Sequence, residues 1–377
     1  MIYLDNAATS HPKPFLVKKA VWDALSHSVN IGRNSSTQAF HYANKILSVR
    51  EDVGKLLGIK NCENIIFTMN ASHSLNFAVK GFLPEGGTVV TTVTEHNSVL
   101  RQVLSNKQYQ VTLLPSNEDH TPNFDLLTIC EKKYTGLLIV NVASNVTGRL
   151  LPYLEIYEKA NRLGWTVLFD FSQAIGNIDI DLGGMNHIMA VSSGHKSLLG
   201  PQGTGFLYVS DDISLSPVLK GGTGSMSNDF HQPDFLPDQF EVGTLNTPGI
   251  LGLGEGVRYV LKETPAILLS HKRELCKLAY EELQQIPTIK LYHSGNFSDY
   301  AGILSFNIGS LYSEEVASLL SKQYGISTRG GFHCAPLMHQ ELGTSTQGTV
   351  RISPGYQTTK KDILKLIDAV YRIDRNH

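Results

Sequence analysis

Short apolar runs alternate with amphipathic stretches along the first two thirds of the chain. Seven of these runs are rich in β-branched or aromatic residues and are bounded by turn-forming residues, which is the pattern of buried strands. They are Asn64–Thr68, Thr88–Thr92, Gln110–Leu114, Gly136–Val142, Trp165–Phe169, His187–Val191 and Thr204–Val209. Because helical segments separate them, we expect a mainly parallel seven-stranded sheet with covering helices.

The intervening stretches repeat apolar residues every three to four positions, which is the period of a helix. The clearest are Ser72–Phe82, Asn97–Ser105 and Leu154–Leu163, and Gly164 follows the last of these as a C-terminal cap would. The segment Gly221–Pro237 is rich in Gly, Ser, Asp and Pro and therefore predicts a long loop.

The order of the elements changes after Pro265. The pattern there predicts a helix, two strands, a helix, a strand, a loop, a strand and a terminal helix. The segments with the clearest pattern are Leu268–Gln284, Gly302–Ile308, Glu314–Tyr324, Thr349–Ser353 and a helix from Thr359. We therefore expect a large α/β domain over residues 15–262 and a smaller α+β domain formed by residues 1–14 and 263–377.

The composition narrows the class of protein. A chain of 377 residues with 41% hydrophobic and 18% charged residues is typical of an ordered, soluble protein. The net charge of −2 and the lack of a Lys/Arg run argue against nucleic acid or an anionic membrane as partner. The longest apolar run, Leu137–Val142, is far shorter than the roughly 20 residues of a membrane helix. The N-terminus lacks a secretory signal pattern, so we expect a cytoplasmic location.

A lysine lies among small residues in the run Ser192–Pro201. Small residues let the backbone turn tightly just past a buried strand, and a lysine there can be desolvated enough to act as an amine, as Schiff-base chemistry requires. An isolated loop lysine is more often solvated. The interpretation of Lys196 as a reactive amine therefore depends on its neighbours.

Asp170 directly follows the apolar strand Trp165–Phe169, and Gln173 comes three residues later. Ligands bind at the carboxyl edge of a parallel sheet, and an aspartate there can keep a pyridinium nitrogen protonated. Asp170 alone could equally cap the following helix. Together with Lys196, it indicates pyridoxal phosphate as the cofactor.

A phosphate group needs hydrogen-bond donors, and the turn Thr68–Ser72 enters a helix directly after a strand. Backbone N–H groups at a helix start, here those of Ala71 and Ser72, bind phosphate, and the Ser72 hydroxyl can add a bond. A plain N-cap serine explains the local sequence equally well. Further candidate contacts to the cofactor are Ser193, His195, Thr244 and, over the ring, His96.

The four cysteines are Cys62, Cys130, Cys276 and Cys334. They form no Cys-x-x-Cys pair, so we expect neither disulfides nor a metal site. The first three lie in helical or turn patterns, as inert cysteines do. Cys334 differs, because the segment Arg329–Pro336 places it in a glycine-containing loop with an arginine and beside His333, which can favour the thiolate.

An arginine lies inside the short apolar strand Val350–Ser353. A guanidinium at such a position can hold an α-carboxylate through two hydrogen bonds, which an amino-acid enzyme needs to orient the Cα–H bond. The alternative for Arg351 is a structural ion pair.

These segments resemble the class V aminotransferase family of fold-type I pyridoxal-phosphate enzymes, and within it the cysteine desulfurases and selenocysteine lyases. The resemblance runs from Tyr3 to about Thr358. The segments that carry it are Tyr3–Ala8, Asn145–Gly148, Asp170 with Gln173, Ser193–Lys196, Phe240–Thr244 and Arg329–Cys334.

The resemblance implies a role for each candidate residue. Lys196 would bind the cofactor covalently, Asp170 would pair with the ring nitrogen, and Gln173 would pair with the ring hydroxyl. The other implied contacts are His96 stacked on the ring, Ala71, Ser72, Ser193 and His195 at the phosphate, Thr244 at the phosphate of a partner subunit, and Asn145, Arg351 and Ala8 at the substrate.

The implied activity is the conversion of L-cysteine to L-alanine, with the sulfur passing to Cys334 as a persulfide. The implied assembly is a homodimer that hands sulfur or selenium to an acceptor protein. Three alternatives stay open at this point: a selenocysteine lyase, a class V transaminase or lyase that acts on another amino acid, and a non-catalytic scaffold.

Overall fold

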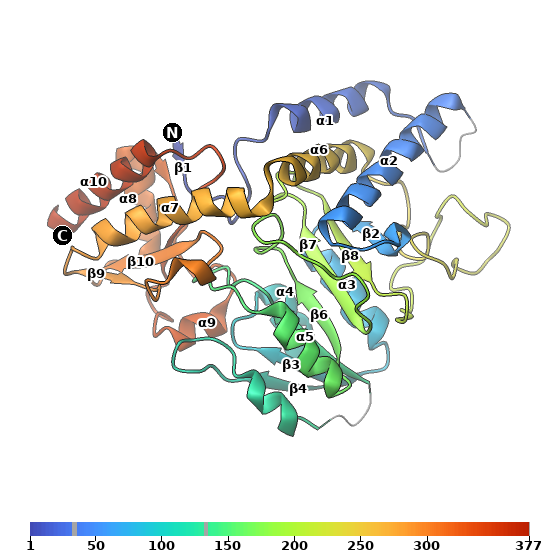
Figure 1. Cartoon of the computed structure of the whole chain (residues 1–377), viewed down its shortest axis with the longest axis horizontal. Helices are drawn as coiled ribbons and strands as arrows, with labels where there is room; N and C mark the ends of the chain where they lie inside the picture. Colours follow the sequence, from blue (N-terminus) through green and yellow to red (C-terminus); the bar gives the residue numbers. More distant parts are fainter. Residues whose placement is uncertain (32–35, 132–134, 377) are drawn as a thin grey trace.

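The structure is a computed structural model that describes residues 1–31, 36–131 and 135–376 (Figure 1). Its centre is one seven-stranded sheet with the strand order β2-β8-β7-β6-β5-β3-β4. The strands are β2 (Ile65–Thr68), β3 (Gly87–Thr92), β4 (Tyr109–Leu114), β5 (Gly136–Asn141), β6 (Thr166–Asp170), β7 (Ile188–Ser193) and β8 (Gly205–Val209). All seven predicted strands are confirmed.

Five neighbouring strands, β3 to β7, run parallel, while β8 is antiparallel to both β7 and β2. Every residue of β5, β6 and β7 is buried, whereas the edge strand β4 alternates between half-buried and exposed positions along most of its length. A strand covered on both faces needs a continuous apolar run, which explains why the sequence pattern identified these strands so clearly.

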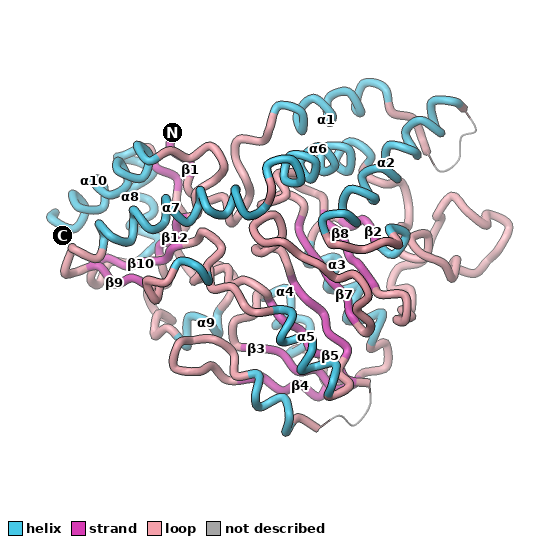
Figure 2. Tube along the Cα trace, in the orientation of Figure 1, coloured by secondary structure: helices cyan, strands magenta, loops and turns pink. Residues whose placement is uncertain are grey.

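Helices cover both faces of the sheet. The helices of this part of the chain are α1 (Phe15–His27), α2 (Thr37–Leu56), α3 (Ala71–Phe82), α4 (Asn97–Leu104), α5 (Tyr153–Arg162) and α6 (Thr247–Glu263). Alternate strand residues point to opposite faces, so Val167 and Phe169 pack in one core with α2, α5 and α6, while Leu168 packs in another with α3 and α4. The arrangement is a three-layer α/β/α domain (Figure 2).

The C-terminal part forms a smaller α+β unit at one end of the molecule (Figure 1). It holds α7 (Pro265–Leu283), β9 (Ile289–Leu291), β10 (Leu304–Ile308), α8 (Ser313–Tyr324), β11 (Ile326–Ser327), α9 (Pro336–Glu341), β12 (Val350–Ile352) and α10 (Lys360–Asn376). Strands β12, β10 and β9 form an antiparallel sheet. Helix α9 falls where the sequence predicted only a loop, which corrects that prediction.

The N-terminus belongs to the same unit. Strand β1 (Ile2–Tyr3) pairs in parallel with β11, and the fully buried Leu4 joins the core formed by α7, α8, α10 and β10. This separate core supports our proposal that residues 1–14 and 263–377 form one domain and residues 15–262 the other.

Among the described residues, three short 3-10 helices complete the elements: η1 (Cys62–Asn64), η2 (Phe124–Ile129) and η3 (Phe297–Asp299). Over the described ranges, no helix is both long and apolar enough to cross a membrane. The same ranges contain no group of three His, Cys, Asp or Glu side chains placed to hold a metal ion. The segment Gly221–Pro237 has neither helix nor strand, as predicted.

A buried ion pair fixes the segment that follows the long loop. Arg50 of α2 and Glu241 form two parallel hydrogen bonds of 2.8 and 2.9 Å, and their side chains are only 6% and 7% exposed. Glu241 Oε1 also accepts a 2.7 Å bond from the Phe67 N–H in β2. The pair therefore connects the segment around Glu241 to both a helix and the sheet.

We expect Arg50→Ala to lower the free energy of unfolding by about 3–5 kcal/mol, because the Glu241 carboxylate would stay buried without its cation. Chemical unfolding followed by circular dichroism measures the change. The control is Arg258→Ala, whose partly exposed pair with Asp52 should contribute about 1 kcal/mol or less. Equal losses in the two variants would contradict the special role of the buried pair.

Candidate active site

A cavity of about 310 Å³ lies at the carboxyl ends of the central parallel strands. Strands β5, β6 and β7 end at Asn141, Asp170 and Ser193, and all three residues line it. The structure brings together in this cavity most residues that the sequence singled out, namely Ala8, Ala71, Ser72, His96, Asn145, Asp170, Gln173, Ser193, His195, Lys196 and Arg351.

Other residues line the same cavity although the sequence did not predict them there. They are Ala7, Asn70, Ser98, Asn141, Ser172, Arg329 and His333. Most are single polar residues in turns, where the sequence holds no periodic signal. The signal that could have identified some of them is closeness in sequence, since Ser98 and Ser172 each come two residues after a candidate. Arg329 was noticed as part of the cysteine loop and not as a wall of the cavity.

Lys196 lies in a tight turn between β7 and β8. Leu199 adopts a left-handed conformation with φ of 60°, and a Cβ on Gly200 would come within 2.8 Å of the Gly194 carbonyl. The glycines thus permit a turn that other residues would block. Burial lowers the pKa of Lys196 to about 8, against the opposing charge of Asp170. Burial therefore raises the share of this side chain that is a neutral amine near neutral pH.

Asp170 is the last residue of β6 and is held between its two neighbouring strands. Its Oδ1 accepts a 2.8 Å bond from the Ser172 N–H, so the carboxylate caps the following turn and lines the cavity at once. The two interpretations offered by the sequence are compatible. Gln173 in the same turn donates a 2.9 Å bond to the Ala7 carbonyl and so holds the N-terminal segment against the site.

His96 is the N-cap of α4. Its Nδ1 accepts a 3.0 Å bond from the Ser98 N–H and lies 2.8 Å from the Ser98 hydroxyl. Burial and then the nearby charge of Lys196 lower the pKa of His96 to about 4, so the ring is neutral at pH 7. With Nδ1 acting as acceptor, the proton lies on Nε2, which makes that nitrogen a hydrogen-bond donor.

The candidate phosphate site lies where α3 begins. Asn70 is the N-cap, because its side chain accepts a 2.9 Å bond from the His73 N–H. The alternative interpretation of Ser72 as the cap is therefore wrong, and its hydroxyl is instead 2.6 Å from that of Ser98. The Ala71 N–H points toward Ser193 Oγ at 3.3 Å. Several donors thus converge on the first turn of a helix, as an anion requires.

Arg351 is buried in β12 and uses part of its guanidinium within the protein. Nη1 donates a 2.7 Å bond to the Asn145 carbonyl, and Nη2 pairs with Asp5 at 2.9 Å. The structural ion pair suggested as an alternative is thus present. Nε is buried and has no partner, so two of five N–H donors are used and the side chain can still bind a carboxylate.

Cys334 lies in the loop between β11 and α9 and is half-buried. Both His333 and Cys334 have positive φ angles, of 48° and 62°, and the Cys334 carbonyl accepts a 2.7 Å bond from the Asn97 N–H. The sulfur is 3.7 Å from Nη2 of Arg329. The thiol is therefore presented from a fixed and strained loop beside a cation.

The expectation that His333 favours the thiolate is wrong. Its side chain is 2% exposed, and its Nε2 lies 3.0 Å from both the carbonyl and the hydroxyl of Thr349. Burial lowers the pKa of His333 to about 2, so the ring carries no charge at neutral pH. Arg329 supplies the positive charge instead.

The three other cysteines lie elsewhere in the chain. Cys62 is in η1, and Cys130 follows η2. Cys276 lies inside α7, where burial raises its pKa to about 12. Burial also raises the pKa of Cys130. Neither of these two thiols has the setting of a nucleophile.

Thr244 lies outside the first cavity. It lines a second cavity of about 410 Å³, together with Arg50, Gly222 and Gly243. The single chain therefore does not bring Thr244 to the other candidate residues, and its predicted contact needs a second subunit.

The residues of the first cavity fit pyridoxal phosphate. Four buried polar atoms of residues that line it have no partner, namely His195 Nδ1, Asn145 Oδ1, His333 Nδ1 and Arg351 Nε. The cavity also offers a buried amine, a buried carboxylate and a helix start to the aldehyde, the ring nitrogen and the phosphate of that cofactor.

The chain is similar to proteins named cysteine desulfurases. It is 30% identical to a probable cysteine desulfurase of Methanothermobacter thermautotrophicus, over 99% of this chain and 94% of the relative. A cysteine desulfurase of Pectobacterium atrosepticum is also 30% identical, over 100% and 93%.

Solved structures agree. The apo cysteine desulfurase of Thermococcus onnurineus superposes with a TM-score of 0.91 at 27% identity, covering 100% of this chain and 95% of that one. The cysteine desulfurase CsdA of Escherichia coli gives a TM-score of 0.86 at 28% identity, over 98% and 94%. The predicted fold-type I architecture is therefore confirmed. A model of the class V aminotransferases matches residues 2–366, and the chain belongs to this pyridoxal-phosphate-dependent family.

Proposed function

We propose that this chain is a cysteine desulfurase that converts L-cysteine to L-alanine and takes up the sulfur on Cys334. The observation that carries the proposal is the thiol of Cys334, 3.7 Å from Arg329, on a loop whose residues Arg329 and His333 line the cavity of Lys196. A transaminase needs no thiol at this place. The full-length similarity to proteins named cysteine desulfurases supports the same activity.

Substrate binding begins with the α-carboxylate. Arg351 has N–H donors left after its bonds to Asn145 and Asp5, and its burial strengthens any ion pair that it forms. Asn145 lies beside it, and its Nδ2 donates a 2.5 Å bond to the His333 carbonyl. Arg351 and Asn145 together therefore position both the substrate and the loop that carries Cys334.

Lys196 removes the Cα proton of the substrate. Bound pyridoxal phosphate supplies an electron sink for the electron pair that remains on Cα. The Lys196 amine, whose neutral form burial favours by lowering the pKa, accepts the Cα proton at Nζ. Asp170 places its carboxyl group in the cavity at the end of β6, and His96 offers a donor at Nε2. These groups hold charges and protons in fixed positions while the bond breaks.

The sulfur then moves to the enzyme. The Cys334 thiolate attacks the sulfur of the substrate, a sulfur–sulfur bond forms, and the carbon–sulfur bond breaks with its electron pair left on the amino-acid carbon. That carbon takes up a proton and becomes the methyl group of alanine. The net change is cysteine plus Cys334 thiol giving alanine plus Cys334 persulfide, which balances without an external oxidant.

Selenocysteine is the alternative substrate, because the same site binds its carboxylate and removes its Cα proton. A selenol leaves more easily than a thiol, so selenium release depends less on Cys334. A class V transaminase is the other alternative, and it predicts no sulfur on Cys334. The complete set of Lys196, Asp170 and Arg351 argues against a non-catalytic scaffold.

We further propose a homodimer with shared active sites. Thr244 lies in a separate cavity of the single chain, and helix α1 exposes an apolar stripe of Phe15, Trp22 and Leu25, each at least 70% exposed. Residues seven and three positions apart share one helix face, and exposed apolar faces of this kind mark interfaces. A cytoplasmic location and an acceptor protein for the sulfur complete the proposal.

We expect Lys196→Ala to reduce alanine formation from cysteine by at least about a hundredfold, because the variant lacks the amine that moves the proton. The purified variant should also lack the visible absorbance of covalently held cofactor. Lys159→Ala is the control, since Lys159 lies on the far helix α5 in an exposed pair with Asp125. Turnover of Lys196→Ala at the wild-type rate would show that another group removes the proton.

We expect Cys334→Ala to bind cofactor and cysteine but to lose most sulfur release from cysteine. Turnover of selenocysteine should fall less. Mass spectrometry of the wild type after reaction should find one added sulfur on the peptide that contains Cys334. Cys130→Ala is the control and should behave as the wild type. Normal desulfuration by Cys334→Ala would show that Cys334 is structural, and it would favour a lyase that releases the sulfur without this thiol.

We expect sedimentation to show a particle of twice the chain mass of 41.5 kDa. Trp22→Glu should shift it toward the monomer, because it places a charge in the proposed interface. Leu364→Glu, at a position 53% exposed on α10, serves as the matched control. A fully active monomeric wild type would rule out shared sites.

A further inference from the structure

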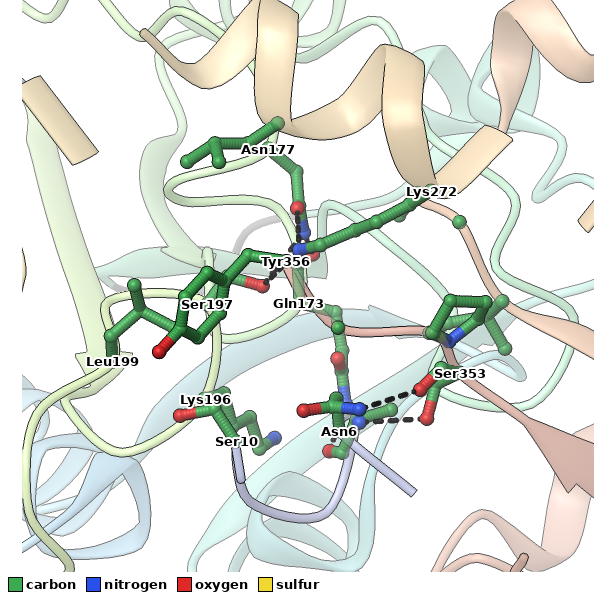
Figure 3. A pocket seen from close by; sticks show the side chains of 17 residues that line it. Asn6, Ser10, Gln173, Asn177, Lys196, Ser197, Leu199, Lys272, Ser353 and Tyr356 are labelled. Atoms are coloured by element: carbon green, nitrogen blue, oxygen red, sulfur yellow. Dashed lines mark hydrogen bonds between the residues drawn. The ribbon is translucent and has the colours of Figure 1, made fainter. Parts of the chain in front are cut away.

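A third, smaller cavity of about 20 Å³ adjoins the candidate active site and shares the lining residues Ala7, Gln173 and Lys196 with it (Figure 3). Its volume is enough for about one water molecule. Lys272 of α7 lines it together with Asn177, Ser197 and Lys196 itself. None of the proposed steps uses Lys272, although it is a buried and ionisable group beside the reactive lysine.

Lys272 is a buried cation held by neutral partners. It is 8% exposed, and its Nζ donates hydrogen bonds of 2.6 Å to Asn177 Oδ1 and 3.3 Å to Ser197 Oγ. Burial lowers its pKa to about 8. A buried ammonium without a carboxylate at these contacts is costly, so an apolar residue would stabilise the fold better at this place. The free-energy cost of burying Lys272 therefore suggests that this side chain has a role other than stabilising the fold.

The contacts of Lys272 reach both turns that carry cofactor residues. Ser197 directly follows Lys196. Asn177 donates bonds of 2.7 Å to the Gln173 carbonyl and 3.0 Å to Ser197 Oγ (Figure 3). Lys272 therefore fixes the Asn177 side chain, which ties the turn after β6 to the turn after β7.

A second lysine holds the other side of Lys196. The carbonyl of His195, the residue before Lys196, accepts a 2.8 Å bond from Lys13 Nζ and a 2.9 Å bond from the Ser10 N–H. Lys13 is half-buried, and burial lowers its pKa to about 8. The residues before and after Lys196 are thus each bonded to a lysine from a distant segment of the chain.

The turn needs such support because it is strained. Leu199 keeps a left-handed conformation that disfavours residues with a Cβ, and a turn of this kind persists only where its surroundings fix it. Lys196 must also place its amine accurately, since an error of about 1 Å can cost roughly a hundredfold in rate.

We propose that Lys272 and Lys13 are positioning residues that fix the residues on either side of Lys196 and thereby place its amine. Lys272 acts through Ser197 and Asn177, and Lys13 acts through the His195 carbonyl. The effect on turnover rests on the proposed function, whereas the effect on the turn itself does not.

The test compares Lys272→Met with Lys277→Met, a lysine on the same helix that is 60% exposed. In cofactor-free protein, Lys272→Met should speed amide hydrogen exchange of residues 194–200 about tenfold and leave exchange in β5 unchanged. In the loaded enzyme, kcat should fall about tenfold while KM for cysteine stays within twofold, because Arg351 is held by Asn145 and Asp5 and not by Ser197. Lys277→Met should match the wild type in both measurements.

Ser197→Ala removes one contact of Lys272 without changing any charge, so it serves if Lys272→Met does not fold. It should produce the same local exchange effect at a few-fold size. Wild-type exchange of residues 194–200 in the folded variants would overturn the proposal. If exchange rises locally but the wild type forms no alanine from cysteine, the proposed function fails and the positioning role stands.

Discussion

The parallel pairing of β6 with β5 and β7 is the constraint on which the site depends. Its register places Asp170 opposite Asn141 and Val191, so three strands end at one edge of the sheet. Residues at the ends of parallel strands meet there with few side-chain neighbours from the sheet, which leaves room for a ligand. The buried, continuous apolar runs that stabilise the sheet therefore also decide where the chemistry lies.

The N-terminal segment joins the two parts of the molecule across this edge. Leu4 is buried in the C-terminal core, and Asp5 pairs with Arg351 in β12. A few residues later, the Ala7 carbonyl binds Gln173 and the Ser10 N–H binds the His195 carbonyl. The substrate arginine and the cofactor turns are thus connected through one short stretch of chain. Without this shared segment, the position of the arginine relative to the cofactor turns would depend on how the two domains pack.

The sequence predicted the features that depend on a local pattern of residues. It did not predict the features that depend on contacts between distant segments. The strands of the large sheet were predicted from short runs rich in β-branched or aromatic residues, but α9 has only six residues, too few for a helical period to be visible. The positive neighbour of Cys334 was assigned to His333, because its burial against Thr349 depends on contacts across the domain. Ser98 and Lys272 belong to the site surroundings through distant contacts that no local pattern encodes.

One distribution of charge suits both reactive groups. The mechanism needs Lys196 as a neutral amine and Cys334 as an anionic thiolate, which are opposite departures from the usual states of an amine and a thiol. Arg329 and Arg351 both lower the pKa of Lys196, and Arg329 also places its positive charge 3.7 Å from the sulfur of Cys334. Asp170 opposes this effect at Lys196 and keeps the amine's pKa from falling further. Two arginines and one aspartate therefore set the charge around a base that lines the cavity and a nucleophile on the loop that borders it.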